Sequence, residues 1–381
     1  MMRSGPYSLL VVALAAVLVV MPASFFIWPS DVGAETFTGE VTGLSSYNQP
    51  KLDIKIDEIY DRGIGLGAQF TIQTDDMKFE DATLVAGYAG IFMYDIFVNI
   101  ETDGYISIGC QGELIVLDEG TEVTLTHSGT SERYRNTPLY NNGSTNKRAD
   151  YSSDEVFANF YEVTGGYLKG GVLYRSFSPL NDPAKQARSQ YVNQLADDAG
   201  IEYLIALSYT DATVAAAVAS LDGYCLTLCE EGKYIAPDMR YLYFQQPEKT
   251  KAVLLSMIDN DGPYLIHCNV GRDRTGFVIL LLQALCHCTA DEMKECETRA
   301  FCNLYHVENG SKEYQTIVSC TYDRNMYLIA HPDQVSHIFE VDWNNIDVRS
   351  VDTYSAAYNY CTDGLGLTAE QVAALQAKLC A

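Results

Sequence analysis

After about residue 35, the chain begins with short segments in which apolar and polar residues alternate. Glycines separate most of them, and they are LDIKIDEI (52–59), AQFTIQT (68–74), IFVNI (96–100), YISIG (105–109), ELIVL (113–117) and EVTLTH (122–127). A period of two predicts β-strands with one buried face. Several short strands at nearly even spacing predict a small all-β barrel or sandwich, which we place at residues 35–128. This segment clusters no His, Cys or paired carboxylates, so the pattern indicates no ligand for it.

From about Val156 the pattern becomes one of alternating strands and helices. The predicted strands are IEYLIAL (201–207), YLYF (241–244) and PYLIHC (263–268). The predicted helices run from Asp182, as N-cap, to Asp198, from Thr250 to Ile258, and onward from Thr275, with capping boxes at Thr289 and Thr368 opening two more. This order predicts an α/β fold over residues 153–381, with a central parallel-type sheet flanked by helices. The polar residues 129–152, which lack apolar periodicity, predict a linker.

The first 34 residues have the character of a targeting segment. Arg3 precedes an apolar run from Leu9 to Trp28, and the small residues Val32-Gly33-Ala34 follow. This arrangement predicts a signal peptide. The run is also long enough to span a bilayer if it is left uncut, so membrane anchoring through residues 9–28 is the alternative. Either version predicts an extracellular or cell-surface protein.

Net charge narrows the possible partners. The 381 residues carry 25 Lys and Arg against 50 Asp and Glu, a formal net charge of −25. Binding to a phosphate backbone requires a continuous basic surface, so a nucleic-acid partner is not expected. An anionic substrate must instead be held by a local group of positive charges. The 11 cysteines do not show zinc-site spacing, and we expect neither a metal nor a cofactor.

One segment carries a complete set of groups for phosphate chemistry, HCNVGRDRTG (267–276), between a predicted strand and a predicted helix. The first amides of a helix have no internal partners and bind anions. Gly271 and Gly276 allow the loop to curl so that its amides face inward. Arg274 can bind two phosphate oxygens at once.

The same electrostatic field acts on the thiol of Cys268. A cysteine at a helix N-terminus beside cations has a lowered pKa, so it is a thiolate at neutral pH. A thiolate below a bound phosphoryl group predicts hydrolysis of phosphomonoesters through a cysteinyl-phosphate intermediate. Thr275 is placed to hydrogen-bond the sulfur, and His267 to orient the sulfur or the loop.

This segment resembles the Cys-x5-Arg-Thr/Ser signature of the protein tyrosine phosphatase superfamily. It is most similar to the bacterial secreted branch, whose usual form is His-Cys-x-x-Gly-Lys-Asp-Arg-Thr-Gly. The resemblance implies a metal-independent phosphatase with Cys268 as nucleophile and Arg274 as the catalytic arginine. It also implies that the phosphate is bound by loop residues, namely Asn269, Val270, Gly271, Arg272, Thr275 and Gly276. The resemblance extends to LYRSFSPLND (173–182), where it implies a substrate-pocket role for Arg175.

Two positions depart from the branch, and one role has two candidates. Arg272 replaces the usual lysine, and Tyr209 stands where many relatives carry an aspartate. Asp273, inside the loop, is the first choice for the general acid that protonates the leaving oxygen. Asp238, in APDMRYLYF, is the alternative, by analogy with relatives that use a separate mobile loop.

Three functions remain open at this point. The leading one is an exported phosphatase acting on phosphotyrosine proteins or other phosphomonoesters. The second keeps the mechanism but takes a phosphoinositide or inositol polyphosphate, because Arg272 widens the positive charge at the loop. The third is a non-catalytic surface binding protein. In an exported protein Cys225, Cys229 or Cys302 could also form a reversible disulfide with an oxidised Cys268.

Overall fold

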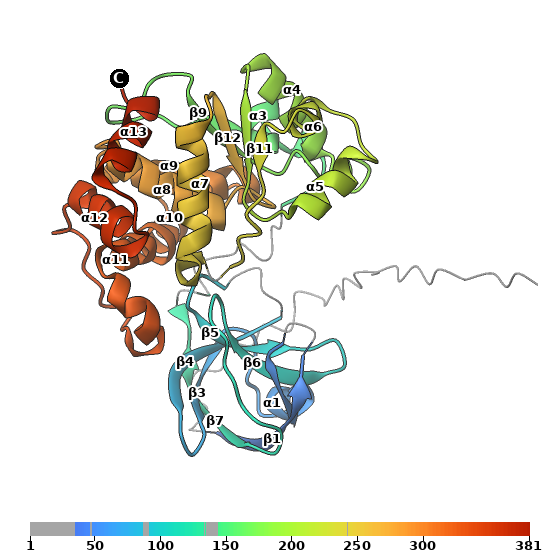
Figure 1. Cartoon of the computed structure of the whole chain (residues 1–381). Coiled ribbons are helices and arrows are strands. Elements are labelled where there is room, and N and C mark those ends of the chain that lie inside the picture. Colours follow the sequence, from blue (N-terminus) through green and yellow to red (C-terminus); the bar gives the residue numbers. More distant parts are fainter. Residues whose placement is uncertain (1–34, 46–47, 87–90, 133, 135–143, 242) are drawn as a thin grey trace, which may run out of the picture.

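Seven strands close into a barrel in the first part of the chain. The computed structural model describes residues 35–45, 48–86, 91–132, 134, 144–241 and 243–381. The barrel strands are β1 (Thr36–Leu44), β2 (Pro50–Lys55), β3 (Ala68–Gln73), β4 (Lys78–Val85), β5 (Ile96–Ile100), β6 (Tyr105–Cys110) and β7 (Glu122–Thr130). Their order is β1-β2-β6-β5-β4-β3-β7, and β7 pairs with β1 to close the barrel. The predicted all-β domain is therefore confirmed, as a barrel (Figure 1).

Among the predicted barrel strands, the segment 52–59 was wrong in part and the segment 113–117 was wrong entirely. The segment 52–59 leaves the strand at Lys55 and continues as helix α1 (Ile56–Tyr60), because Ile56 and Ile59 then bury on the same helix face. The segment 113–117 forms only an isolated bridge through Glu113, and Val116 is 76% exposed. A closed barrel has no free edge with which this segment could pair.

The second sheet has five strands in the order β11-β10-β12-β9-β8. They are β8 (Tyr161–Glu162), β9 (Leu173–Ser176), β10 (Tyr203–Ala206), β11 (Tyr234–Ile235) and β12 (Tyr264–His267). All neighbours are parallel except β8 and β9, so the sheet is mixed. His267 is in register with both Ala206 and Ser176. The carboxyl ends of three parallel strands therefore lie at one edge, where ligands bind in open α/β sheets.

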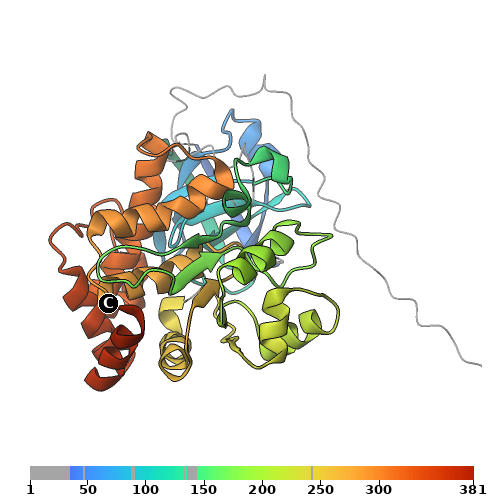
Figure 2. The ribbon, with the colours of Figure 1, turned by 90° about the horizontal axis from the view of Figure 1, so that it is seen from above.

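Helices cover both faces of this sheet, as predicted. The helices of this part of the chain are α3 (Asp154–Ala158), α4 (Arg188–Asp198), α5 (Asp211–Val218), α6 (Tyr224–Glu230), α7 (Pro247–Asp259), α8 (Asp273–Leu285), α9 (Ala290–Tyr305), α10 (Lys312–Val318), α11 (Arg324–Ala330), α12 (Thr353–Asn359) and α13 (Ala369–Leu379). Leu204 and Leu265 pack in one core, with α4 to α6, while Ile205 and Ile266 pack in the other, with α7 and α8 (Figures 1 and 2). The two capping boxes are present as predicted.

Two predicted elements of the α/β part were wrong. The helix predicted from Asp182 begins at Arg188, because the Asp182 carboxylate accepts a hydrogen bond from the Ala184 amide and forms a turn instead. Within the predicted strand 241–244, Tyr243 and Phe244 lie in a 3₁₀ turn, Tyr243–Gln245. The Tyr243 ring stacks on Phe277 of α8 and the Phe244 ring packs on it at a tilt, so packing on that helix outweighs the strand propensity.

The barrel packs against α11 and the segment that follows it. Tyr94 stacks on Trp343 at 5.0 Å between ring centroids, and a buried ion pair joins Asp95 to Arg324 at 2.9 Å. The domain boundaries stay predictions, although β7 already extends to Thr130. The predicted leader and the apolar run 9–28 lie outside the described residues. In the part of the chain that is described, no helix is both long and apolar enough to cross a bilayer.

Candidate active site

The loop that follows β12 has its backbone carbonyls turned into the protein. The carbonyl oxygens of residues 269 to 272 accept hydrogen bonds, in order, from the Ser178 amide (3.1 Å), the Asn159 side chain (3.1 Å), Arg175 Nη2 (2.9 Å) and the Gly276 amide (2.7 Å). The amides of the same four residues donate to no described residue. Amides that point away from these carbonyls form a concave group of free donors, which is an anion-binding nest.

Two glycines of the signature are required by close packing. Gly271 has φ +70°, and a Cβ there would lie 2.0 Å from the Ser176 carbonyl oxygen. A Cβ on Gly276 would lie 2.4 Å from the Glu297 carboxylate. The loop therefore fits against β9 only with glycine at position 271, whereas a side chain at position 276 would displace the Glu297 carboxylate.

Cys268 lies at the base of this loop and is only 1% exposed. Burial raises the pKa of its thiol, but the Arg274 charge and hydrogen bonds from the Thr275 hydroxyl and amide outweigh burial, so the net shift is downward. The downward shift favours the thiolate, which is the nucleophilic form of cysteine. The Thr275 hydroxyl is buried beside the sulfur, and none of the described residues forms a regular hydrogen bond with it.

His267 supports the loop from the last position of β12. It is fully buried, and burial lowers the pKa of its imidazole to about 4. The ring is therefore neutral at pH 7, and its Nδ1 lies 2.9 Å from the Cys268 carbonyl oxygen. A carbonyl only accepts, so Nδ1 carries the proton. This placement fits the predicted orienting role.

Arg274 presents its guanidinium beside the sulfur. It lies in the first turn of α8, is 6% exposed, and donates from Nη1 to the Met239 carbonyl oxygen at 3.1 Å. The Tyr241 ring stacks over the guanidinium at 4.6 Å. Its Nε is buried without a partner in the described residues. The guanidinium is thus anchored on one side and keeps a donor for a phosphate oxygen.

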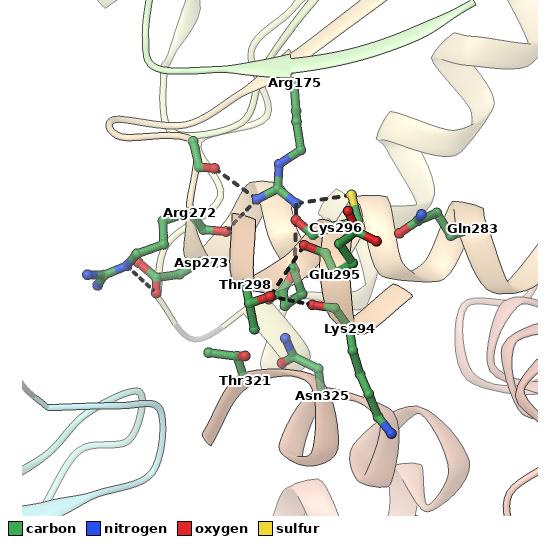
Figure 3. A network of polar contacts seen from close by, with 12 residues as sticks. Arg175, Arg272, Asp273, Gln283, Lys294, Glu295, Cys296, Thr298, Thr321 and Asn325 are labelled. Carbon is green, nitrogen blue, oxygen red and sulfur yellow. Dashed lines mark hydrogen bonds and ion pairs between the residues drawn. The ribbon is translucent and has the colours of Figure 1, made fainter. Parts of the chain in front are cut away.

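The side chain of Arg272 lies away from the position predicted for it. Its Nε pairs with Asp273 at 2.9 Å (Figure 3). Its Nη1 donates to the Tyr305 hydroxyl at 2.9 Å, and its guanidinium lies over the Phe301 ring. This charge is already used inside the protein. The structure therefore does not support the predicted substrate contact by the Arg272 side chain. The backbone amide of Arg272 remains available to the nest.

Arg175 is also placed differently from the prediction. It lies on β9 with no exposed surface, and its guanidinium donates to the carbonyls of Gly271 and Arg272 (Figure 3). The Glu297 carboxylate lies 3.7 Å from its Nη1. A side chain sealed beneath the loop cannot reach a substrate. Arg175 is therefore a positioning residue that keeps the loop carbonyls directed into the protein. Because each carbonyl shares a peptide plane with the next amide, Arg175 also fixes the orientation of the amides.

The two candidates for the general acid lie in different surroundings. Asp273 is the first residue of α8, and its charge acts on both Cys268 and Tyr241. Asp238 is half-exposed and ion-paired with Lys249 at 3.5 Å. The structure therefore brings Asp273 closer to the reacting sulfur, and its role as acid stays a prediction.

Three further residues of this site were not recognised from the sequence. Tyr241 and Met239 contact Arg274, and Asn159 supports the loop carbonyls. Asn159 adopts the left-handed conformation, φ 49°, at the end of α3. An asparagine directly after a short capped helix is a signal that could have indicated this position. Tyr241 and Met239 carry no comparable signal.

The site thus has the parts of a cysteine-dependent phosphatase, namely a cysteine, an arginine and a loop of inward-facing amides. Residues 228–381 match a family model described as the tyrosine phosphatase family, and this range contains the whole loop. This part of the chain is therefore similar to the tyrosine phosphatase family, as its signature indicated. The described residues hold no group of three or more His, Cys, Asp or Glu that would suit a metal ion.

Comparisons with whole proteins show only remote similarity. No curated protein matches the chain. An uncharacterized conserved protein from Thermotoga maritima is 14% identical, over 23% of this chain and 35% of its own, with a TM-score of 0.22. The core catalytic domain of the PP-IP phosphatase SIW14 from S. cerevisiae, in complex with citrate, is 18% identical, over 46% of this chain and 93% of its own, with a TM-score of 0.27. The chain thus spans about a third of the length of the Thermotoga protein.

Proposed function

We propose that this protein is an exported phosphatase that hydrolyses phosphotyrosine. The main support for this substrate class is that most cations near the loop are ion-paired with carboxylates of the protein. Four of them face carboxylates, namely Arg272 with Asp273 (2.9 Å), Arg175 with Glu297 (3.7 Å), and Lys249 and Arg240 with Asp238 (3.5 and 3.9 Å). Arg274 is the fifth cation near the loop, and it faces the nest with no carboxylate ion pair to a described residue. One guanidinium and one ring of amides suit a single phosphate dianion.

The depth of the sulfur supports an aryl ester. Cys268 is almost fully buried, and Tyr241 lies beside Arg274 with 44% of its surface exposed. The exposed Tyr241 ring offers an aromatic surface beside Arg274 that a phenyl phosphate could contact while its phosphate lies at the loop.

The reaction proceeds in two steps. The Cys268 thiolate attacks phosphorus while the P–O bond to the phenol breaks, and Asp273 gives its proton to the departing oxygen. The loop amides and Arg274 stabilise the charge on the equatorial oxygens. Water then attacks the cysteinyl phosphate, gives a proton to Asp273, and releases phosphate and the thiolate, which Thr275 stabilises.

The inositol polyphosphate alternative loses the feature that suggested it. That feature was a wider positive charge from Arg272, but this side chain is paired with Asp273 and directed toward Tyr305. A substrate with several phosphates would have to find further cations in a chain with a net charge of −25. A non-catalytic role would not explain why the pKa of the Cys268 thiol is lowered, so this alternative is less well supported.

Turnover on two substrate classes tests this proposal. The purified protein should hydrolyse a phosphotyrosine peptide at least about tenfold faster, by kcat/KM, than inositol polyphosphates or a phosphoserine peptide. A tenfold preference for inositol polyphosphates would overturn the substrate class. Cys268→Ser should release no phosphate from p-nitrophenyl phosphate while its circular dichroism spectrum is unchanged. Undiminished activity in that variant would remove the mechanism. Export is tested separately, by fractionating cells and sequencing the N-terminus of the mature protein.

A further inference from the structure

Two cysteines far apart in the sequence lie in direct contact. The sulfur atoms of Cys286 and Cys380 are 2.6 Å apart, although 94 positions separate them in the chain. Cys286 is the residue directly after α8 and Cys380 the residue directly after α13. A covalent S–S bond measures about 2.05 Å, and two sulfurs that are not bonded do not normally approach as closely as these two.

The backbone on both sides holds the two sulfurs at this position. The Cys286 carbonyl accepts from the Tyr167 amide at 2.8 Å, and the Tyr167 carbonyl accepts from the Ala381 amide at 2.8 Å. Leu168 forms an antiparallel bridge with Cys380 itself. One connecting segment therefore hydrogen-bonds to the backbone beside each cysteine, so the contact does not depend on a flexible side chain.

The α8 and α13 ends are also joined directly. The Gln376 side chain donates to the Leu285 carbonyl oxygen at 2.7 Å, one residue before Cys286. The Lys169 amide donates to the Leu379 carbonyl at 2.8 Å, one residue before Cys380. Both thiols are thus fixed in the folded protein, and forming a bond between them requires only a small shift of the two sulfurs.

We infer that Cys286 and Cys380 form a disulfide that links the end of α8 to the end of α13. Cys380, which is partly exposed, is the thiol that a small disulfide reaches first, whereas Cys286 is buried. With oxidised glutathione as the oxidant, the Cys380 thiolate attacks one glutathione sulfur and releases one glutathione. The Cys286 thiolate then attacks the Cys380 sulfur of the mixed disulfide and releases the second glutathione. Two protein thiols are oxidised, and one glutathione disulfide is reduced to two thiols.

The cross-link is separate from the catalytic chemistry. Helix α8 has 13 residues, so Cys286 lies about 20 Å from the signature loop at its other end. Cys268 therefore stays available as a thiolate when the link forms. An exported protein would meet an oxidising environment in which such a link persists.

Peptide mapping tests the inference without any mutation. The full protein is incubated with glutathione disulfide, its remaining thiols are blocked with N-ethylmaleimide, and it is digested with trypsin. Cleavage after Arg274, Lys294 and Lys378 gives the peptides 275–294 and 379–381. The expected product joins these two peptides and separates on reduction. A free or glutathione-bound Cys380 under these conditions would overturn the inference.

Cys288 lies in the same tryptic peptide and provides the matched control. Cys288→Ser should leave the cross-linked product unchanged, whereas Cys286→Ser should abolish it. A product that disappears with Cys288→Ser would place the link at the wrong cysteine and contradict the inference. Oxidised wild-type protein should melt about 5–10 °C above both the reduced protein and Cys380→Ser, because the link closes a long loop. Equal melting temperatures would contradict a stabilising link.

Discussion

Replacing Arg175 with methionine removes the residue that holds the catalytic loop from below. Its guanidinium donates to Gly271 O at 2.9 Å, to Arg272 O at 3.3 Å and to Cys296 O at 3.3 Å, and it has no exposed surface. Hydrogen bonds from a charged donor are worth about 1.5–3 kcal/mol each. Breaking a buried pair by removing one partner costs about 3–5 kcal/mol, which is the loss of unfolding free energy we expect for Arg175→Met.

The effect on catalysis should exceed the effect of lost stability. Without the guanidinium, the two loop carbonyls can rotate, and the amides of the same peptide planes then leave the phosphate. Loss of one oxyanion donor lowers kcat by about 10²–10³-fold, so we expect a fall of at least about 100-fold on p-nitrophenyl phosphate. The assay measures kcat and KM well below the melting temperature of the variant, with inhibition by inorganic phosphate as a measure of nest geometry.

Arg188→Met is the matched control. Arg188 is 2% exposed and also donates to backbone carbonyls, including Thr145 O at 2.7 Å, but it does not contact the loop. It should lose comparable stability while kcat stays within about threefold of wild type. The reasoning is refuted if folded Arg175→Met keeps wild-type kcat and phosphate affinity, or if Arg188→Met loses as much activity.

Three further predictions follow from the same geometry. Gly271→Ala should lower kcat by at least about 100-fold, because φ at this position is positive and a Cβ would collide with the Ser176 carbonyl. Gly200 also has a positive φ but has open space around it, so Gly200→Ala should lose only about 1 kcal/mol of stability. Similar kcat values in the two variants would contradict this reasoning. Thr275→Ala should raise the pKa of the Cys268 thiol, and the pH profile of iodoacetamide alkylation should shift upward; an unchanged profile would remove the hydrogen bond from the account. Burial raises the pKa of Glu297 to about 7, so the folded state keeps a proton that the unfolded state loses near its ordinary pKa of about 4.3. Stability should therefore fall by about 3 kcal/mol as pH rises from about 4.5 to 7, and Glu297→Gln should remove that slope in urea unfolding, whereas equal slopes would contradict the buried carboxyl.

The sequence predicted the parts of this molecule that depend on local patterns. Alternation predicted most barrel strands, because a period of two reflects burial of one face, and the residues after Thr275 predicted a helix. The loop from His267 to Gly276 was recognisable because its chemistry is contained in ten consecutive residues. These features need no knowledge of distant contacts.

The errors arose where distant residues decide the outcome. Tyr243 and Phe244 have high strand propensity, but the ring of Phe277 offers them a better packing partner. Arg175 and Arg272 are cations near the loop, and only the fold shows that Glu297 and Asp273 already face them. The general effect is that charge counted along a sequence overestimates the charge free to bind a substrate.

The central claim is that the loop amides and Arg274 hold a phosphoryl group above an ionised Cys268. Rapid acid quenching during turnover of p-nitrophenyl phosphate, followed by tryptic mapping, tests it directly. The account predicts a phosphoryl group on Cys268 in the peptide 252–272, absent from Cys268→Ser. Turnover with phosphate on another residue, or with an unmodified Cys268 at every quench time while Cys268→Ser stays active, would contradict it.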